Sequence, residues 1–230
     1  MNPGPVAAGR PIVGTGQNLP PIVDQTYNMG PTAAPQIEAY YTGSAIDKDR
    51  RGVAKAAQRW INRWIGANCE GTSRKALRQC RAMVVFDIDE TLLNAFSYYV
   101  TQTPAFTYDP KTWADYQTSC GYSAIQTIDL YQALRKRGVR LALVSAGSEA
   151  QRAVMTKCLQ SKGVSGWSAY RLRGPDAAKI SIGDWKASQR KELERAGNRI
   201  IASIGDQVSD MSHGHLMRGF LLPNTMYQLS

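Results

Sequence analysis

The sequence VVFDIDETL at residues 84–92 is an apolar run that ends in two carboxylates, Asp87 and Asp89, followed by Thr91. Short β-branched and aromatic runs are typical of a strand that is buried on both faces of a parallel sheet. The two carboxylates then emerge at the carboxyl end of that strand, where ligands bind in open α/β sheets. Because neighbouring carboxylates repel each other, this arrangement favours a bound cation. The alternative is an acidic turn, since short motifs also match by chance.

The composition is that of an ordinary globular protein. The chain has 230 residues, of which 43% are hydrophobic and 20% are charged. This length suffices for one α/β core with a small insert and an extension. No apolar stretch approaches the ~20 residues of a membrane helix, so we expect no membrane span. The first residues lack the basic start and apolar core of a signal peptide, and we expect none in this sequence.

The formal net charge of +10 is concentrated just ahead of the acidic strand. Residues 48–81 contain ten Lys or Arg against only Asp49 and Glu70. Such a basic segment can attract an anionic substrate, a membrane surface or a nucleic acid. We favour a solvated face of an amphipathic helix, because apolar residues recur in it at helical spacing. We therefore expect no nucleic acid partner.

The four cysteines leave two interpretations open. Cys69, Cys80, Cys120 and Cys158 show no CxxC or Cys/His spacing, which argues against a zinc site. Cys69 and Cys80 could form a disulfide in an oxidising compartment, and the even count favours a secreted or periplasmic location. Free buried thiols are the alternative.

Three segments are expected along the chain. Residues 1–47 are rich in Pro and Gly without sustained periodicity, which predicts an extended arm. Residues 48–82 are a basic helical extension, and apolar spacing predicts a helix over 47–65 whose tryptophans face the core. Residues 83–230 form the core. Within it, the aromatic segment 94–122 interrupts the alternation of strands and helices, which predicts a small cap beside the acidic strand end.

Strands and helices alternate through the rest of the core. Apolar patterns predict helices over 125–137, 148–162 and 187–196, and strands over 139–145 and 199–204. Such alternation forms a parallel sheet with right-handed crossovers, which gathers the carboxyl ends of the strands along one edge.

Each of the three predicted strands ends in polar residues. Asp87 and Asp89 follow the first strand, Ser145 ends the second, and Asp206 and Asp210 follow the third. A serine at a strand end is often only a helix cap. Three polar ends at one edge of a sheet, however, indicate a binding or catalytic site.

These motifs resemble those of the haloacid dehalogenase superfamily of phosphatases. DIDET at residues 87–91, Ser145, Lys186 and GDQVSD at residues 205–210 match its four motifs in order. DIDETLLNAFSYY and the closing LPNTMYQL at residues 222–229 are similar to the branch that contains plant acid phosphatases, vegetative storage proteins and bacterial class B and class C enzymes. The resemblance implies a Rossmann-like, three-layer α/β fold with a parallel sheet, a small cap after the first core strand and an N-terminal helical extension.

The resemblance implies a magnesium-dependent acid phosphatase that acts on phosphate monoesters. Asp87 would be the nucleophile that forms an aspartyl-phosphate, and Asp89 would act as general acid and then general base. Mg²⁺ would be held by the Asp87 carboxylate, the Asp89 backbone carbonyl and Asp206. Asp210 would orient a water in the outer sphere of the ion or brace Lys186.

The resemblance also implies a phosphate-binding set. Ser145, Ala146 and Lys186 would bind the phosphoryl oxygens as negative charge develops on them. Related enzymes commonly have Ser/Thr-Gly-Arg in the second motif, whereas this chain has SAGS at residues 145–148, without the arginine. Arg152, about one helical turn further on, is the nearest candidate for a substitute.

A second hypothesis is a catalytically weak or silent binding or storage protein on the same fold. It would use the basic segment or the N-terminal arm to engage a partner. Under the first hypothesis the partner is a small phosphorylated substrate, such as a nucleotide or another monoester. A homo-oligomer is compatible with either hypothesis.

Overall fold

A six-stranded parallel sheet forms the centre of the molecule. The computed structural model describes residues 12–14, 27–28 and 30–229. The strand order is β1-β9-β8-β3-β6-β7, and every pairing is parallel. The strands are β1 (Ile12–Gly14), β3 (Ala82–Phe86), β6 (Arg140–Ser148), β7 (Ala169–Arg173), β8 (Arg199–Gly205) and β9 (Gly219–Leu221). The predicted α/β fold with a parallel sheet is confirmed.

The acidic strand lies at the centre of this sheet. β3 pairs with β8 on one side and β6 on the other, and all five of its residues are buried. Val84 and Phe86 contribute to one hydrophobic cluster, while Met83 and Val85 contribute to the cluster on the opposite face. Side chains of a strand alternate between faces, so a continuous apolar run is required where both faces are covered.

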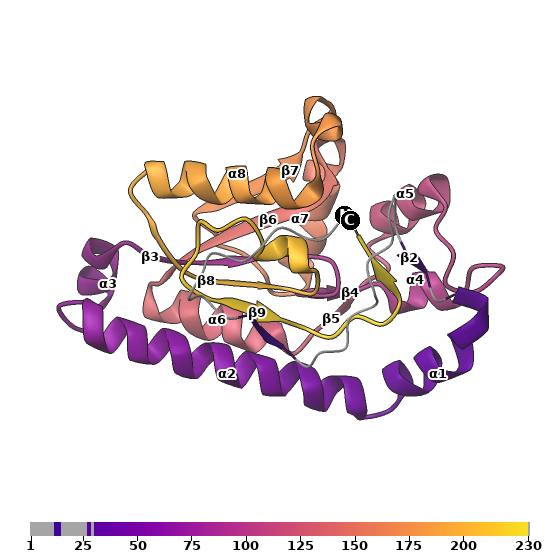
Figure 1. Ribbon diagram of the computed structural model, residues 1–230, viewed down its shortest axis with the longest axis horizontal. Coiled ribbons are helices and arrows are strands. Elements are labelled where there is room, and N and C mark those ends of the chain that lie inside the picture. The colour runs from indigo at the N-terminus through magenta and orange to yellow at the C-terminus, as the bar shows by residue number, and fades with distance from the viewer. Residues whose placement is uncertain (1–11, 15–26, 29, 230) are drawn as a thin grey trace.

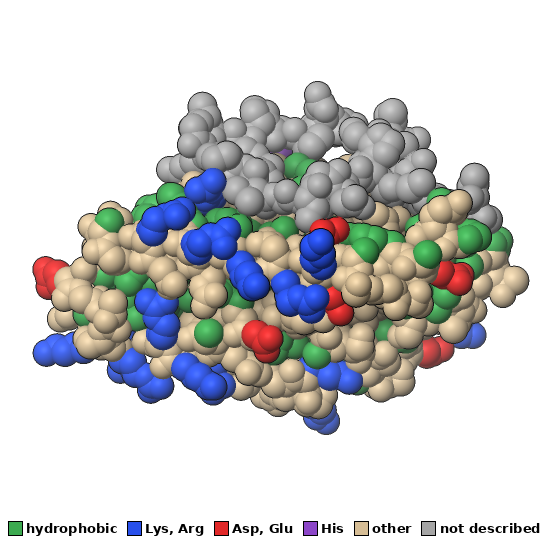
Figure 2. All heavy atoms as spheres, turned by 90° about the horizontal axis from the view of Figure 1, so that it is seen from below, with side chains coloured by type: hydrophobic (Ala, Val, Ile, Leu, Met, Phe, Trp, Pro, Cys, Tyr) green, Lys and Arg blue, Asp and Glu red, His purple; other side chains and the backbone are tan. Residues whose placement is uncertain are grey.

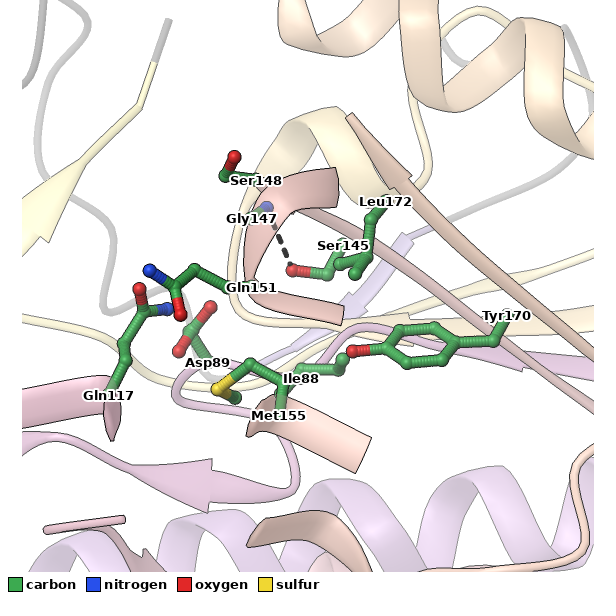
Figure 3. A pocket seen from close by; sticks show the side chains of 10 residues that line it. All are labelled: Ile88, Asp89, Gln117, Ser145, Gly147, Ser148, Gln151, Met155, Tyr170 and Leu172. Atoms are coloured by element: carbon green, nitrogen blue, oxygen red, sulfur yellow. Dashed lines mark hydrogen bonds between the residues drawn. The ribbon is translucent and has the colours of Figure 1, made fainter. Parts of the chain in front are cut away.

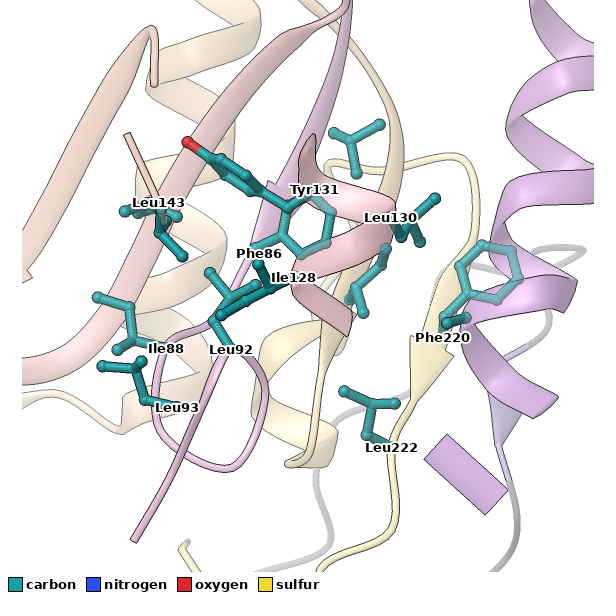
Figure 4. Close-up of a cluster of buried hydrophobic side chains, with 14 of the residues drawn as sticks. Phe86, Ile88, Leu92, Leu93, Ile128, Leu130, Tyr131, Leu143, Phe220 and Leu222 are labelled. Atoms are coloured by element: carbon teal, nitrogen blue, oxygen red, sulfur yellow. The ribbon is translucent and has the colours of Figure 1, made fainter. Parts of the chain in front are cut away.

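Helices cover both faces, which makes the fold three-layered (Figure 1). One face carries α2 (Ala45–Asn68), α6 (Thr127–Arg137) and α7 (Arg152–Ser161), whose buried hydrophobic residues belong to the larger cluster. Figure 4 shows Phe86 of β3 against Tyr131 of α6, with ring centroids 5.4 Å apart. The other face carries α8 (Ile182–Arg195).

The N-terminal helical extension packs along the sheet. The helix expected over 47–65 is α2, and Trp64 is buried in the core as predicted. Trp60 is partly buried and donates its indole N–H to the carbonyl of Ile201 at 2.9 Å. Figure 2, which views the molecule from the side on which α2 lies, shows Lys and Arg side chains spread over this face among neutral and apolar atoms. Within the described ranges, no helix combines the length and apolar character needed to cross a bilayer.

The expectation of an extended arm over residues 1–47 is wrong for part of that range. Residues Gly30–Thr42 form helix α1, because Ile37 and Tyr41, one turn apart, are buried in the core cluster. β1 pairs with β9, and β2 (Tyr27–Asn28) pairs with β10 (Tyr227–Gln228). The remainder of the predicted arm lies outside the described residues.

Several element boundaries differ from the sequence prediction. The helix expected over 187–196 begins at Ile182, because the hydroxyl of Ser181 accepts a hydrogen bond from the amide of Asp184 at 3.0 Å and caps it. The segment expected as a helix over 148–162 is a 3₁₀ turn, Glu149–Gln151, followed by α7. Strands β1, β7 and β9 were not predicted, because β1 and β9 have only three residues each and β7 is a half-exposed edge strand with a weak apolar pattern.

The aromatic insert leaves the core at β4 (Leu93–Asn94) and returns at β5 (Ser123–Ala124), which pair in antiparallel fashion. Between them lie α4 (Phe96–Val100) and α5 (Pro110–Ser119). We call residues 94–122 the cap. Cys69 is bonded to Cys80 and Cys120 to Cys158, which decides between the two interpretations of the cysteines. The second disulfide joins the end of α5 to α7, a pairing that the sequence did not predict.

Candidate active site

The register of the sheet brings the three predicted strand ends to one level. Phe86 of β3 is paired with Leu143 of β6 and with Ile204 of β8. Two residues further along each strand lie Ile88, Ser145 and Asp206, and the amide of Asp87 donates to the carbonyl of Ile204 at 2.9 Å. The predicted gathering of these ends at one edge is therefore present.

Asp87 lies in a buried ion pair with Lys186. The ammonium of Lys186 is 2.9 Å from Oδ1 of Asp87 and also contacts Asp210, and all three side chains are buried. Burial raises the pKa of Asp87 well above its usual value, with Lys186 acting in the opposite direction. Burial lowers the pKa of Lys186, but the charges of Asp210 and Asp87 outweigh this and raise it. Lys186 therefore stays charged, and α8 holds its ammonium group against Asp87.

Asp206 and Asp210 complete a cluster of carboxylates around Asp87. One oxygen from each of the three lies within 4.8 Å of the others, and all three residues are buried. Asp206 accepts hydrogen bonds from Asn224 at 2.8 Å and from the side chain of Gln207 at 2.6 Å. Burial and the charge of Asp210 raise the pKa of Asp206 to about 6.

The loop that carries Asp206 and Asp210 depends on a glycine and a buried arginine. A Cβ at Gly205 would collide with the side chain of Asp210, so only glycine fits there. Arg190 of α8 is fully buried and donates to the carbonyls of Asp210, Ser212 and Gly214. These three hydrogen bonds of the guanidinium fix the backbone of the loop.

The carboxylate cluster fits a divalent cation. Three buried carboxylates face a single contacting cation, Lys186, within the part of the chain that the structure describes. Excess negative charge in a buried site is costly unless a positive ion is bound. Hard carboxylate oxygens suit Mg²⁺ or a similar hard ion.

Asp89 lies on the cap side of the site. Its Oδ1 accepts a hydrogen bond from the hydroxyl of Tyr122 at 2.9 Å. Burial raises the pKa of Asp89, and the Tyr122 hydrogen bond opposes that shift. Figure 3 shows the Asp89 carboxylate close to the side chains of Gln117 and Gln151, in a pocket that also contains Ser145. The pocket is lined by Ile88, Asp89, Gln117, Ser145, Gly147, Ser148, Gln151, Met155, Tyr170 and Leu172.

The second motif forms a bulge at the end of β6. Ser145 pairs with Leu172 and Ser148 pairs with the next residue of β7, so Ala146 and Gly147 protrude from the ladder. The amide of Gly147 donates to Oγ of the buried Ser145 at 3.1 Å, the bond drawn in Figure 3. This turn places the Ser145 hydroxyl and the loop backbone at the edge of the sheet.

Arg152 does not take the place of the missing arginine in this structure. Its guanidinium pairs with Glu149, donates to the carbonyl of Tyr170 at 3.3 Å and lies over the Tyr170 ring. These contacts direct it to the edge strand β7. Lys186 is thus the one cation that contacts the carboxylate cluster among the described residues.

Glu90 forms a buried ion pair that the sequence did not predict. Its carboxylate accepts from Arg50 of α2 at 2.7 Å and from the amide of Ala95 at 2.7 Å. Both members of the ion pair are almost fully buried, and Glu90 has a left-handed backbone with φ of 53°. Burial raises its pKa to about 7, although the charge of Arg50 acts in the opposite direction. This ion pair therefore connects α2 to the turn that follows Asp89.

Several residues that contact the predicted ones were not predicted from the sequence. Asn224 lies in LPNTMYQL, so the family motif carried a signal for it, although no role was assigned. Tyr122, Arg190 and Arg50 lie in the cap and helices, where no short pattern marks them.

The raised pKa values predict how stability changes with pH. The pKa of Glu90 is raised from 4.5 to about 7 and that of Asp206 from 3.8 to about 6. Between the ordinary and the raised pKa, each carboxyl group is protonated in the folded protein and ionised in the unfolded chain. The free energy of unfolding should therefore fall as pH rises from about 4 to 7 when no divalent cation is present. Mg²⁺ should raise the Tm, and more at pH 7 than at pH 5, since metals bind deprotonated carboxylates. Calorimetry with chelator and with Mg²⁺ tests both trends, and a Tm that rises with pH in chelator would contradict the first.

Comparisons with known proteins agree with this geometry. Residues 25–230 match the family of the HAD superfamily, subfamily IIIB (Acid phosphatase). The chain is 30% identical over 154 residues to acid phosphatase 1 of Solanum lycopersicum, covering 65% of this chain and 60% of that protein. It is 28% identical over 149 residues to vegetative storage protein 1 of Arabidopsis thaliana, covering 62% and 54%. The chain thus spans less than two thirds of these relatives.

A solved structure supports the fold. The class C acid phosphatase from Bacillus anthracis superposes with a TM-score of 0.67 at 17% identity, with 85% of each chain covered. At this identity the similarity supports the shared architecture and carries no information about substrate.

Proposed function

The chain belongs to subfamily IIIB of the haloacid dehalogenase superfamily, the acid phosphatases, and from this premise we propose that it is a magnesium-dependent phosphomonoesterase that acts through Asp87. The observation that carries the proposal is the contact of the buried Asp87 carboxylate with Lys186 at 2.9 Å, beside Asp206 and Asp210. A carboxylate beside a fixed cation is suited to receive a phosphoryl group, since the cation can stabilise the charge that develops on it.

The first step transfers the phosphoryl group to Asp87. A carboxylate oxygen of Asp87 attacks phosphorus while the bond to the leaving oxygen breaks, and Asp89 gives that oxygen a proton. Ser145, the backbone of Ala146 and Lys186 bind the phosphoryl oxygens. Apart from Asp89, the side chains that line the pocket are neutral. The proposed substrate is a small phosphate monoester, such as a nucleotide, whose leaving group would lie beside Asp89.

The second step hydrolyses the aspartyl-phosphate. Asp89, now a carboxylate, takes a proton from the attacking water, and the Asp87 carboxylate is released with inorganic phosphate. Activity on the acidic side of neutrality follows, because Asp89 must be protonated at the start of the cycle.

Mg²⁺ would be held by Asp87, the backbone carbonyl of Asp89 and Asp206. When bound, it supplies positive charge that neutralises the phosphate and offsets the repulsion among the carboxylates. Asp210 pairs with Lys186 and positions its ammonium group, and Asp210 would not itself be a ligand of the ion.

One observation favours a second function. The second motif lacks its arginine, and Arg152 is directed to Tyr170. Two of the relatives by sequence are vegetative storage proteins. A weak or silent binding or storage protein on this fold is therefore the alternative.

Hydrolysis of para-nitrophenyl phosphate by purified protein tests the proposal. Turnover between about pH 5 and 7, the range in which tuned carboxylic acids act, should disappear with chelator and return with added Mg²⁺. Calcium serves as the matched control, because its larger and looser coordination should support little turnover. Folded protein without turnover under any of these conditions would favour the storage alternative.

A further inference from the structure

We propose that Tyr122 of the cap is a positioning residue that orients the carboxyl group of Asp89 for proton transfer to the leaving group. The proposal rests on the phosphatase function proposed above. Its geometric basis is the 2.9 Å hydrogen bond from the Tyr122 hydroxyl to Oδ1 of Asp89. Tyr122 is 2% exposed, so this hydroxyl is shielded from bulk water.

The hydrogen bond decides which oxygen of Asp89 can carry the transferred proton. Tyr122 donates to Oδ1, so the acidic proton of Asp89 belongs on Oδ2. In the first step that proton passes from Oδ2 to the leaving oxygen, as the bond from phosphorus to that oxygen breaks and the bond to Asp87 forms. The carboxylate that remains keeps the Tyr122 hydrogen bond, which is stronger to an ionised acceptor.

Tyr122 is suited to remain a donor throughout the cycle. Its hydroxyl is buried and its hydrogen bond runs to Asp89, so it acts only through that carboxyl group.

The cap holds Tyr122 rigidly. The disulfide at Cys120 joins this segment to α7 only two residues before Tyr122. The ring of Tyr116 packs edge-on against that of Tyr122 with centroids 5.0 Å apart, and Trp113 does so at 5.9 Å. β5, which follows directly, pairs with β4. The aromatic residues of the cap thus fix the position of a hydroxyl at the reacting centre.

Dependence on the leaving group distinguishes positioning from a structural role. The experiment measures kcat/KM of wild type and Tyr122→Phe with Mg²⁺ for para-nitrophenyl, phenyl and glycerol phosphate. Nitrophenolate leaves with little need of a proton, whereas an alkoxide requires one. We expect Tyr122→Phe to lower kcat/KM by about tenfold or more for glycerol phosphate and by under about threefold for the nitrophenyl ester. The larger loss is part of the rate enhancement that a general acid usually contributes.

Tyr116→Phe is the matched control. It removes a hydroxyl from the same cap, but that hydroxyl bonds Ser97 at 2.8 Å and not Asp89. The change in kcat/KM that Tyr116→Phe causes should be the same for all three substrates. In an Asp89→Asn background, Tyr122→Phe should cost nothing further, because the proton donor is already absent.

Three outcomes separate the possibilities. Wild type without turnover would contradict the proposed function itself. Active wild type with an equal loss by Tyr122→Phe on all three substrates would overturn the role of Tyr122 and leave the function intact. If Tyr122→Phe does not fold, as judged by its Tm, the three substrates are compared with Tyr122→Leu, which also lacks the hydroxyl that donates to Asp89, and the same selective loss for glycerol phosphate is expected.

Discussion

Replacement of Asp87 by Asn is expected to lower kcat by roughly 10⁴-fold or more, the scale of loss seen when a covalent nucleophile is removed. Asn has nearly the same shape and keeps an oxygen that can accept from Lys186 at the position of Oδ1. The amide is a poor nucleophile, so the aspartyl-phosphate cannot form. Initial rates on para-nitrophenyl phosphate with Mg²⁺ measure the effect.

The same variant should remain folded. It removes one of three buried like charges, and the Tm measured in chelator should be equal to that of wild type or higher. Asp129→Asn makes the same chemical change at an exposed position of α6 and should leave kcat unchanged. Hydrolysis retained by Asp87→Asn would show that another group attacks phosphorus, and the proposed mechanism would be discarded.

The parts of the site that the sequence predicted are those encoded by strand ends. Asp87, Ser145 and Asp206 each follow an apolar run, and parallel pairing brings such ends together without any knowledge of side-chain packing. Lys186 was found only through the resemblance, because its helix begins at Ile182, just after the capping Ser181 and five residues before the predicted start. The local sequence pattern was therefore enough to predict the strands that carry the carboxylates, but not the start of α8, which carries Lys186.

Contacts between distant segments explain what the sequence did not predict. Tyr122 is separated from Asp89 by 33 residues, and Arg50 from Glu90 by 40. Their partners are decided by how the cap and α2 pack on the core, which no periodic pattern encodes. Both contacts converge on the turn after β3. The short acidic motif is thus held by contacts with both the cap and α2.

Arg50→Met is expected to lower the free energy of unfolding by about 3–5 kcal/mol, the range for breaking a buried ion pair at one partner. Methionine fills much of the space of the arginine stem but leaves Glu90 buried without its counter-charge, at a site where both side chains are at most 2% exposed. Thermal or urea unfolding measures the loss. Arg51→Met, at the exposed neighbouring position of the same helix, is the matched control and should change stability by under about 0.5 kcal/mol.

A second substitution separates the buried charge from simple loss of packing. Arg50→Met combined with Glu90→Gln removes the charge and should recover part of the lost stability, because a neutral amide is cheaper to bury than a carboxylate. The deficit of the single variant should also be smaller at pH 5 than at pH 8. Glu90 already has a pKa near 7 with Arg50 present, and without Arg50 it can become neutral by taking a proton. A deficit that is equal at both pH values, with no recovery in the double variant, would mean that Arg50 stabilises the helix by packing alone.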